Sequence, residues 1–201
     1  MNPPLKIQII IGSTRQNRFS EKPAHYIFEE LKKREDVEAE LLDLREWPLP
    51  FYDEAIPPAG NKGNYSNPLC KEWANKIGEG DGYIIVSPEY NHGYSAVIKN
   101  ALDWVYPEWN KKPVGFVGYG NAGGSRAIEQ LRQVVIELRM VPIFNSIHIP
   151  PEVYLAVLHE KLPVNPDLFL PLREGRRGDR VESFFAELID YAKILKAARG
   201  N

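Results

Sequence analysis

Short apolar runs, rich in β-branched residues, recur along most of this chain. The first covers 5–11, reads LKIQIII and stops at Gly12. Runs of this kind are typical of strands that are buried on both faces of a parallel sheet. The pattern predicts strands at 5–11, 38–44, 81–87, 113–120 and 142–149.

Between these runs, apolar residues recur at the spacing of a helix. After Ser20, a suitable N-cap residue, Ala24, Ile27 and Leu31 fall on one helical face. Further helices are predicted over about 69–77, 96–106, 125–140 and 180–199. Each predicted strand is therefore followed by a helix.

Repeated strand–helix units fold into a parallel sheet with helices on both faces, because the crossovers are right-handed. The sequence therefore predicts an α/β fold, a doubly wound sheet of five parallel strands. Ligands of such sheets bind beyond the carboxyl ends of the strands, at the switch point. We expect function in the loops that follow the first, third and fourth strands.

Length and proline content suggest how the chain is organised. With 201 residues, the chain fits one domain, which we expect to cover 1–201. Its 17 prolines cluster at 48–68, 142–151 and 163–171, which predicts long loops. A Pro-rich insertion at about 151–179 precedes the last helix.

Charge and cysteine content restrict the partners. A net charge of −2 provides no basic field that would hold nucleic acid or an anionic membrane. No run approaches the ~20 apolar residues of a membrane span. Cys70 has no second cysteine to pair with, and the four histidines show no metal-ligand spacing. We therefore expect a cytoplasmic protein that binds no metal, nucleic acid or membrane.

The loop after the first strand reads GSTRQNRFS and lies before a helix N-terminus. Its hydroxyls, its arginines Arg15 and Arg18 and the free N–H groups of a first helical turn all favour an anion. We predict a phosphate site. Neither GxxxxGK[ST] nor GxGxxG is present, which argues against ATP and a Rossmann-bound dinucleotide. The alternative is that Ser20 only caps the helix and the arginines are solvated.

The loops after the third and fourth strands suit an aromatic heterocycle. The third strand runs into SPEYNHGYSAVIKNALDW, which gathers aromatic and amide groups at 88–94. The fourth runs into GYGNAGGSRA, whose four glycines within 118–124 let backbone N–H groups approach a flavin. Alternatively, the glycines serve only the turn. His92 is assigned no chemistry, and Ser87 and Ser125 lack the GxSxG elbow of a hydrolase.

Taken together, the three loops resemble those of the NADPH-dependent FMN reductase family, over about residues 5–150. The resemblance implies a flavodoxin-like sheet of order 2-1-3-4-5 and non-covalently bound FMN. The first loop would hold the phosphate, and the other two would hold the isoalloxazine. The implied FMN-binding residues are Ser13, Arg15, Arg18, Phe19 (through its backbone) and Ser20; Pro88, Glu89, Tyr90 and Asn91; and Tyr119, Gly120, Gly123 and Gly124.

The resemblance also implies the reaction. NADPH or NADH would pass a hydride to the flavin N5, and a quinone, azo compound, metal oxyanion or free flavin would then be reduced. No side-chain base is needed, so no catalytic residue is assigned. Arg126 is a candidate for the 2′-phosphate of NADPH, or it pairs with Glu129 on the surface. Members of the family are usually homodimers or homotetramers. The segment 151–179 departs from the family, and one interpretation is an arm that wraps a partner.

Two other functions compete with this one. An FMN-dependent electron carrier without NAD(P)H activity is disfavoured by the near-neutral charge and by Arg15. A flavin-free hydrolase or sensor of a phosphate ligand is the third hypothesis. Aromatic residues after the third strand are expected to contribute in part to an oligomer interface. They are Tyr94, Trp104, Tyr106 and Trp109.

Overall fold

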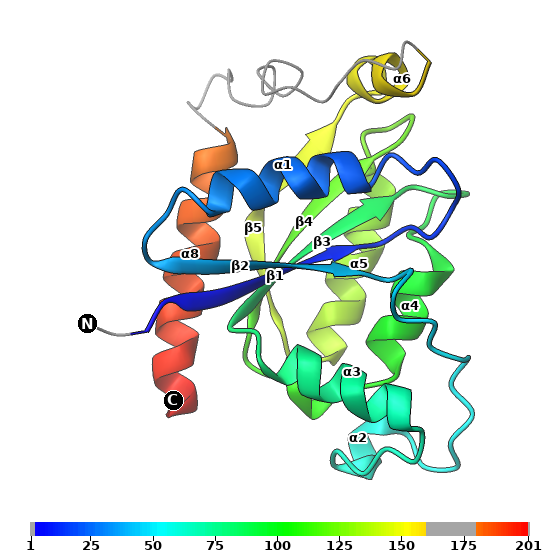
Figure 1. Ribbon diagram of the computed structural model, residues 1–201, viewed down its shortest axis with the longest axis vertical. Helices are drawn as coiled ribbons and strands as arrows, with labels where there is room; N and C mark the ends of the chain where they lie inside the picture. Colours follow the sequence, from blue (N-terminus) through cyan, green and yellow to red (C-terminus); the bar gives the residue numbers. More distant parts are fainter. Residues whose placement is uncertain (1–2, 160–179, 201) are drawn as a thin grey trace.

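The computed structural model describes residues 3–159 and 180–200. Its centre is a five-stranded, all-parallel sheet with the order β2-β1-β3-β4-β5, which confirms the predicted fold (Figure 1). The strands are β1 Leu5–Ile11, β2 Val37–Asp43, β3 Gly82–Pro88, β4 Pro113–Tyr119 and β5 Val141–Ile149.

The strands read as continuous apolar runs because both faces of the sheet are covered. In β1, Ile7 and Ile9 belong to one hydrophobic cluster, whereas Ile10 belongs to the cluster on the opposite face. Successive side chains of a strand point to opposite faces, so both kinds of position must be apolar here.

Helices form a layer on each face. The helices α1 Glu21–Leu31 and α8 Arg180–Arg199 pack on one face. The other face is covered by α3 Pro68–Gly78, α4 Ala96–Asp103 and α5 Ser125–Glu137. Figure 1 shows α1 and α3 on opposite sides of β1 and β2.

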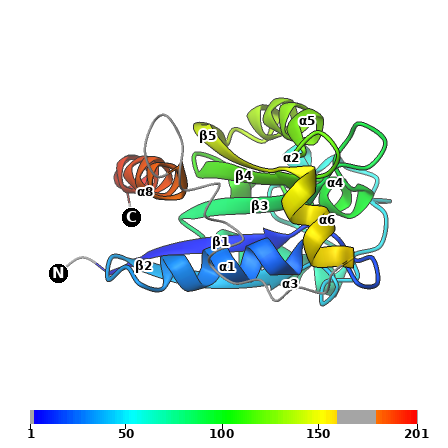
Figure 2. The ribbon, with the colours of Figure 1, turned by 90° about the horizontal axis from the view of Figure 1, so that it is seen from above.

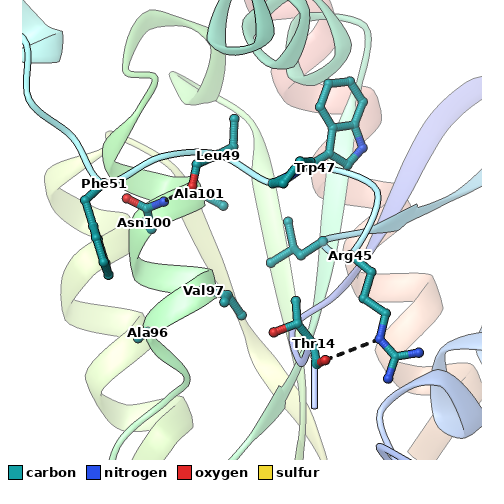
Figure 3. A pocket seen from close by; sticks show the side chains of 11 residues that line it. Thr14, Arg45, Trp47, Leu49, Phe51, Ala96, Val97, Asn100 and Ala101 are labelled. Atoms are coloured by element: carbon teal, nitrogen blue, oxygen red, sulfur yellow. Dashed lines mark hydrogen bonds between the residues drawn. The ribbon is translucent and has the colours of Figure 1, made fainter. Parts of the chain in front are cut away.

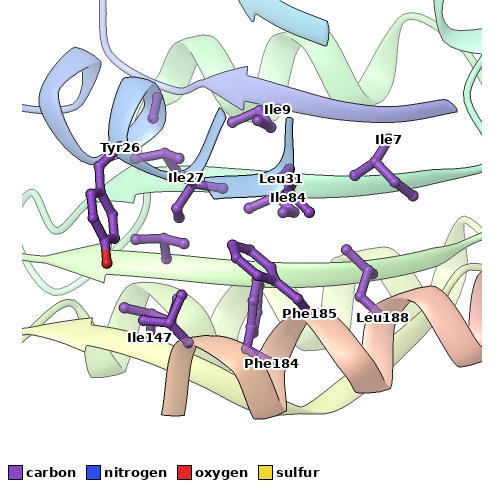
Figure 4. Packing of buried hydrophobic residues seen from close by; sticks show 14 of the residues in the cluster. Ile7, Ile9, Tyr26, Ile27, Leu31, Ile84, Ile147, Phe184, Phe185 and Leu188 are labelled. Carbon is purple, nitrogen blue, oxygen red and sulfur yellow. The ribbon is translucent and has the colours of Figure 1, made fainter. Parts of the chain in front are cut away.

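The last helix completes the core on the α1 side. Phe184, Phe185 and Leu188 extend from α8 toward the strands (Figure 4) and are at most 2% exposed. Burying each of these side chains contributes roughly 1.5 to 3 kcal/mol. The amphipathic pattern at the end of the sequence therefore fixes α8 to the sheet.

The structure differs from the prediction after β3. The helix expected over 96–106 ends at Asp103, and a 3₁₀ turn, η1 Pro107–Trp109, follows. Pro107 cannot continue the helical hydrogen bonds, which explains the early end. Trp104 and Trp109 are fully buried, so the expectation that they form an interface is wrong for these two residues.

Two Pro-rich segments contain helices that the sequence pattern did not indicate. The connection before α3 holds the short helix α2 Pro58–Asn61. The insertion at 151–179 begins with α6 Pro151–His159, whose Val153 and Val157 are buried in the α1-side cluster. Figure 2 shows α6 running from the end of β5 toward the start of α1. The rest of the insertion, 160–179, lies outside the described residues.

Candidate functional site

The sheet brings the three predicted loops to one edge. The ends of β1, β3 and β4 are neighbours because these strands are adjacent and parallel. The loops 12–20, 88–95 and 120–124 are joined there by direct contacts. The Tyr90 hydroxyl lies 2.9 Å from the Ser13 hydroxyl, and the Glu89 N–H donates to the Tyr119 carbonyl at 2.9 Å.

The first loop offers unpaired hydrogen-bond donors. The backbone N–H groups of Ser13, Thr14 and Gln16 have no partner among the described residues. The loop is closely held at its base, where the Gly12 N–H donates to the Val86 carbonyl at 2.9 Å. Successive free N–H groups before a helix N-terminus form a site for an anion.

Ser20 carries a buried hydroxyl with no good partner. The residue stands at the N-cap position of α1, yet its side chain makes no capping hydrogen bond. Its Oγ is buried and, within the described part of the chain, lacks a partner in hydrogen-bond geometry. The nearby Tyr119 phenol is also buried, and burial raises its pKa. A buried polar atom without a partner is costly, so this hydroxyl is available to a ligand.

The two arginines of the first loop have different environments. Arg15 is exposed, and its guanidinium makes no hydrogen bond or ion pair with any described residue. Arg18 is 4% exposed and donates to Asp43 at 2.6 Å and to the Ser13 carbonyl at 2.7 Å. Burial opposes its charge, but the hydrogen bonds and charge of Asp43 raise the Arg18 pKa. Arg15 is thus free to bind a phosphate, whereas Arg18 is occupied in holding the loop.

Asp43 and Arg45 are site residues that the sequence reasoning missed. Burial would raise the pKa of Asp43, but hydrogen bonds from Arg18 and from the Arg45 N–H hold it below its usual value. Arg45 also donates to the Thr14 carbonyl at 3.3 Å, as Figure 3 shows. The available signal was an acidic residue at the carboxyl end of a strand beside the first.

A cavity of about 370 Å³ opens beside the first loop. Its walls are mainly apolar, and Trp47 and Phe51 lie at opposite ends of it (Figure 3). Phe51 is 81% exposed. The lining residues are Thr14, Leu44, Arg45, Trp47, Pro48, Leu49, Phe51, Ala96, Val97, Asn100 and Ala101.

The second loop contains a tight turn. Tyr90 and Gly93 exchange two backbone hydrogen bonds of 2.8 and 2.9 Å, and Asn91 and His92 between them both have positive φ. This pair of positive φ values is the signature of a type I′ turn, for which Asn is well suited. The turn exposes the side chains of Tyr90 and Asn91 at the edge of the sheet.

The Glu89 side chain is turned away from solvent and is 4% exposed. It accepts from the Arg126 N–H at 3.1 Å and from Arg126 Nε at 2.7 Å. The surface pair expected between Arg126 and Glu129 is therefore replaced by one with Glu89. The cause is topological, since Glu89 and the start of α5 follow neighbouring strands.

The third loop depends on glycine. Gly120, Gly123 and Gly124 all have positive φ, and a Cβ on Gly124 would lie 2.5 Å from Gly118 Cα. The N–H groups of Asn121 and Ala122 have no partner among the described residues, so they are available to a ligand. His148 of β5 also contacts this loop, and its Nδ1 lies 3.2 Å from the Gly123 carbonyl. The sequence did not indicate this residue.

An aromatic triangle connects the first and third loops to α6. The ring centroids of Phe19 and Tyr119 are 4.9 Å apart, and Tyr154 of α6 lies 5.4 Å from Phe19 and 5.7 Å from Tyr119. Such contacts contribute roughly 0.5 to 1.5 kcal/mol each beyond burial. The start of the Pro-rich insertion therefore supports the loops of the site.

These groups fit FMN. The unpaired N–H groups, Ser20 and Arg15 suit a phosphate, and the glycine backbone and Tyr90 suit a planar ring. Nowhere in the described residues do three or more potential metal ligands gather. Within 3–159 and 180–200, no helix has the length and apolar character needed to cross a membrane.

A doubly wound parallel sheet of order 2-1-3-4-5, with unpaired donors after β1 and a glycine-rich loop after β4, defines a flavodoxin-like α/β protein. The family model of the NADPH-dependent FMN reductases matches residues 5–152. The chain belongs to this family of FMN-dependent oxidoreductases, as its three loops predicted.

Individual relatives agree with this assignment. An NAD(P)H-dependent FMN reductase of Schizosaccharomyces pombe is 37% identical over 147 residues, which are 72% of this chain and 74% of that protein. An FMN-dependent NADPH-azoreductase of Staphylococcus aureus is 35% identical over 148 residues, 71% of this chain and 76% of the relative. The solved structure of FerB, a flavoenzyme NAD(P)H:(acceptor) oxidoreductase from Paracoccus denitrificans, has the same fold. It superposes with a TM-score of 0.67 at 20% identity, covering 93% of this chain and 98% of FerB.

Proposed function

We propose that this chain binds FMN at the carboxyl edge of its sheet and uses NAD(P)H to reduce small electrophilic molecules. The observation that carries this proposal is the set of unpaired polar groups in the first loop, next to the glycine-rich third loop. Most buried polar groups in folded proteins have hydrogen-bond partners, so a cluster of groups without them indicates that a ligand supplies the partners.

Each loop has a distinct role in this proposal. Ser13, Ser20, the free N–H groups and Arg15 bind the phosphate, with Phe19 contributing its backbone N–H. Arg18 keeps the loop in shape through Asp43. The backbone of 88–91 lies along the ring, while Tyr119, Gly120, Gly123 and Gly124 let the third loop approach its pyrimidine edge.

Bound FMN would supply the redox chemistry, accepting a hydride from NAD(P)H and reducing an acceptor that binds next. The chain's own part is to orient the ring and to present N–H groups to it. Quinones, azo compounds, metal oxyanions and free flavin are the acceptor classes we propose. The azoreductase relative supports the azo class.

We further propose that the protein acts as a homodimer or homotetramer. The apolar cavity beside the first loop and the 81% exposed Phe51 at its rim support an interface there. A large exposed apolar group beside a hollow is typical of interaction surfaces. Light scattering after size-exclusion chromatography tests this, and a monomer at micromolar concentration would refute it.

An anaerobic absorbance titration tests the proposed function. The FMN-loaded protein is titrated with NADPH and then with NADH, after which a quinone or an azo dye is admitted. We expect the oxidised-flavin band to bleach and to recover with either acceptor. A flavin that binds but never bleaches would favour the electron carrier. A protein that binds no FMN would refute the proposal.

A further inference from the structure

Where the second loop meets the third, the buried carboxylate of Glu89 is paired with Arg126. Both oxygens of Glu89 are engaged by Arg126, one by the backbone N–H and the other by the Nε and Nη2 of the guanidinium. Arg126 is the second residue of α5. Glu89 therefore caps the start of this helix and pairs with its first cation, an arrangement that the helix dipole favours.

The pair is connected to the first loop. Arg126 Nη1 lies 2.7 Å from His92 Nε2, and Gln130 donates to the His92 carbonyl at 2.9 Å. His92 is part of the tight turn that carries Tyr90, whose hydroxyl contacts Ser13. A continuous set of contacts thus joins α5, the second loop and the phosphate loop.

The carboxylate also adjoins the third loop. A Cβ on Gly120 would lie 3.1 Å from the Cβ of Glu89, and the Glu89 N–H donates to Tyr119. The pair therefore lies at the junction of the two loops that line the isoalloxazine in the proposed site. The Glu89 carboxylate is 4% exposed, whereas the Arg126 side chain is 39% exposed, so water screens the carboxylate less than the cation.

We propose that Glu89 and Arg126 are positioning residues of the flavin site, which fix its loops and cancel each other's charge at this junction. This inference rests on the proposed function. Reduced FMN carries a negative charge at its pyrimidine edge, so an unbalanced charge here changes the affinity for reduced relative to oxidised FMN. Loss of the anion and loss of the cation act in opposite directions.

The test is the reduction potential of bound FMN, measured at pH 8 against a reference dye. Glu89→Gln leaves the Arg126 cation unbalanced, and we expect reduced FMN to be favoured at least tenfold. That factor corresponds to about 30 mV for two electrons. Arg126→Gln leaves the carboxylate unbalanced, and we expect a shift of similar size toward a lower potential. Arg126→Lys keeps the charge, so its potential stays near that of the wild type while FMN binds more weakly.

The matched control is Asp103→Asn, which breaks the exposed pair of Lys99 and Asp103 on α4 and should leave the potential unchanged. Shifts of the same sign in Glu89→Gln and Arg126→Gln, or no shift in either, would overturn the inference. If Arg126→Gln does not fold, an unchanged potential in Glu89→Gln is sufficient to overturn it. A wild-type protein that binds no FMN would instead refute the proposed function, and this inference with it.

Discussion

The two edges of the sheet are both polar, but the charged groups at the amino edge have partners, whereas several donors at the carboxyl edge do not. At the amino edge, Asp81 accepts from Lys196 at 2.7 Å, from Arg199 at 3.0 Å and from the Lys6 N–H at 3.1 Å. The Lys112 ammonium likewise has three hydrogen-bond partners within 3.1 Å, two backbone carbonyls and the Tyr83 hydroxyl. At the carboxyl edge, Ser20 and several N–H groups lack partners in the described chain.

This difference separates stability from binding. Groups that already have partners contribute to the free energy of unfolding, and their removal leaves an unpaired charge. Groups without partners do not stabilise the fold, and a buried one such as the Ser20 hydroxyl destabilises it until a ligand supplies the hydrogen bond. Substitutions at the amino edge should therefore reduce stability without affecting FMN. Substitutions of the unpaired groups at the carboxyl edge should weaken FMN binding without reducing stability.

The largest effect is expected at Gly124, because its backbone conformation requires glycine and it belongs to the proposed FMN site. Gly124→Ala would place a Cβ 2.5 Å from Gly118 Cα at a φ of +73°. Strain and overpacking together cost about 4 kcal/mol of the free energy of unfolding. Urea denaturation measures this loss, and FMN binding should disappear with it. The control is Gly78→Ala, whose Cβ would meet nothing within 4 Å. An unaffected Gly124→Ala would contradict the packing of the third loop.

At the amino edge, Asp81→Asn should lower the free energy of unfolding by about 3 kcal/mol, because Lys196 and Arg199 lose their shared anion. The affinity for FMN should stay within twofold of the wild type. Denaturation and an FMN titration of the same preparation check both statements. A large loss of FMN affinity in a folded variant would remove the distinction between the edges.

The lowered pKa of the buried Lys112 ammonium should make the free energy of unfolding depend on pH. Burial and the charge of Arg199 lower its pKa to about 8, although Asp81 and Glu108 act in the opposite direction. Between pH 8 and the ordinary lysine value, the unfolded chain therefore binds more protons than the folded one. Stability attributable to Lys112 rises with pH across this window, by roughly 3 kcal/mol at most. Denaturation curves of Lys112→Met should lack this rise, and an equal rise in both proteins would contradict the assignment.

A smaller effect is expected from α6. Tyr154→Ala removes two aromatic contacts with Phe19 and Tyr119, which should cost about 1.5 kcal/mol of stability. We also expect severalfold weaker FMN binding, because both contacted residues belong to the site. Tyr191→Ala, on the exposed side of α8, is the matched control. Equal FMN affinity in the two variants would show that α6 does not support the loops.

The sequence was sufficient to predict the sheet and the three loops that meet at its carboxyl edge. Apolar runs such as LKIQIII determine buried strands, and the order of strands and helices then determines which loops meet. What it did not reveal was the pairing of charges. Arg15 and Arg18 look alike in the sequence, and only the position of Asp43 at the end of β2 distinguishes them. Pairing across loops depends on side-chain geometry that no local pattern contains.

The same limit applies to the aromatic residues and to the insertion. Trp104 and Trp109 suit a core or an interface equally well, and the fold decides for the core. The start of the insertion is rich in apolar residues, but its helix became evident only from the burial of Val153 and Val157.

The most direct test of the account is an FMN titration of Arg15→Ala beside Lys71→Ala, which removes an equal charge from an exposed site on α3. Loss of a hydrogen bond to a charged group costs about 1.5 to 3 kcal/mol. We therefore predict that FMN binds Arg15→Ala roughly 10- to 150-fold more weakly, with unchanged thermal stability, and binds Lys71→Ala like the wild type. Equal dissociation constants for the two variants would contradict the phosphate site at the carboxyl edge.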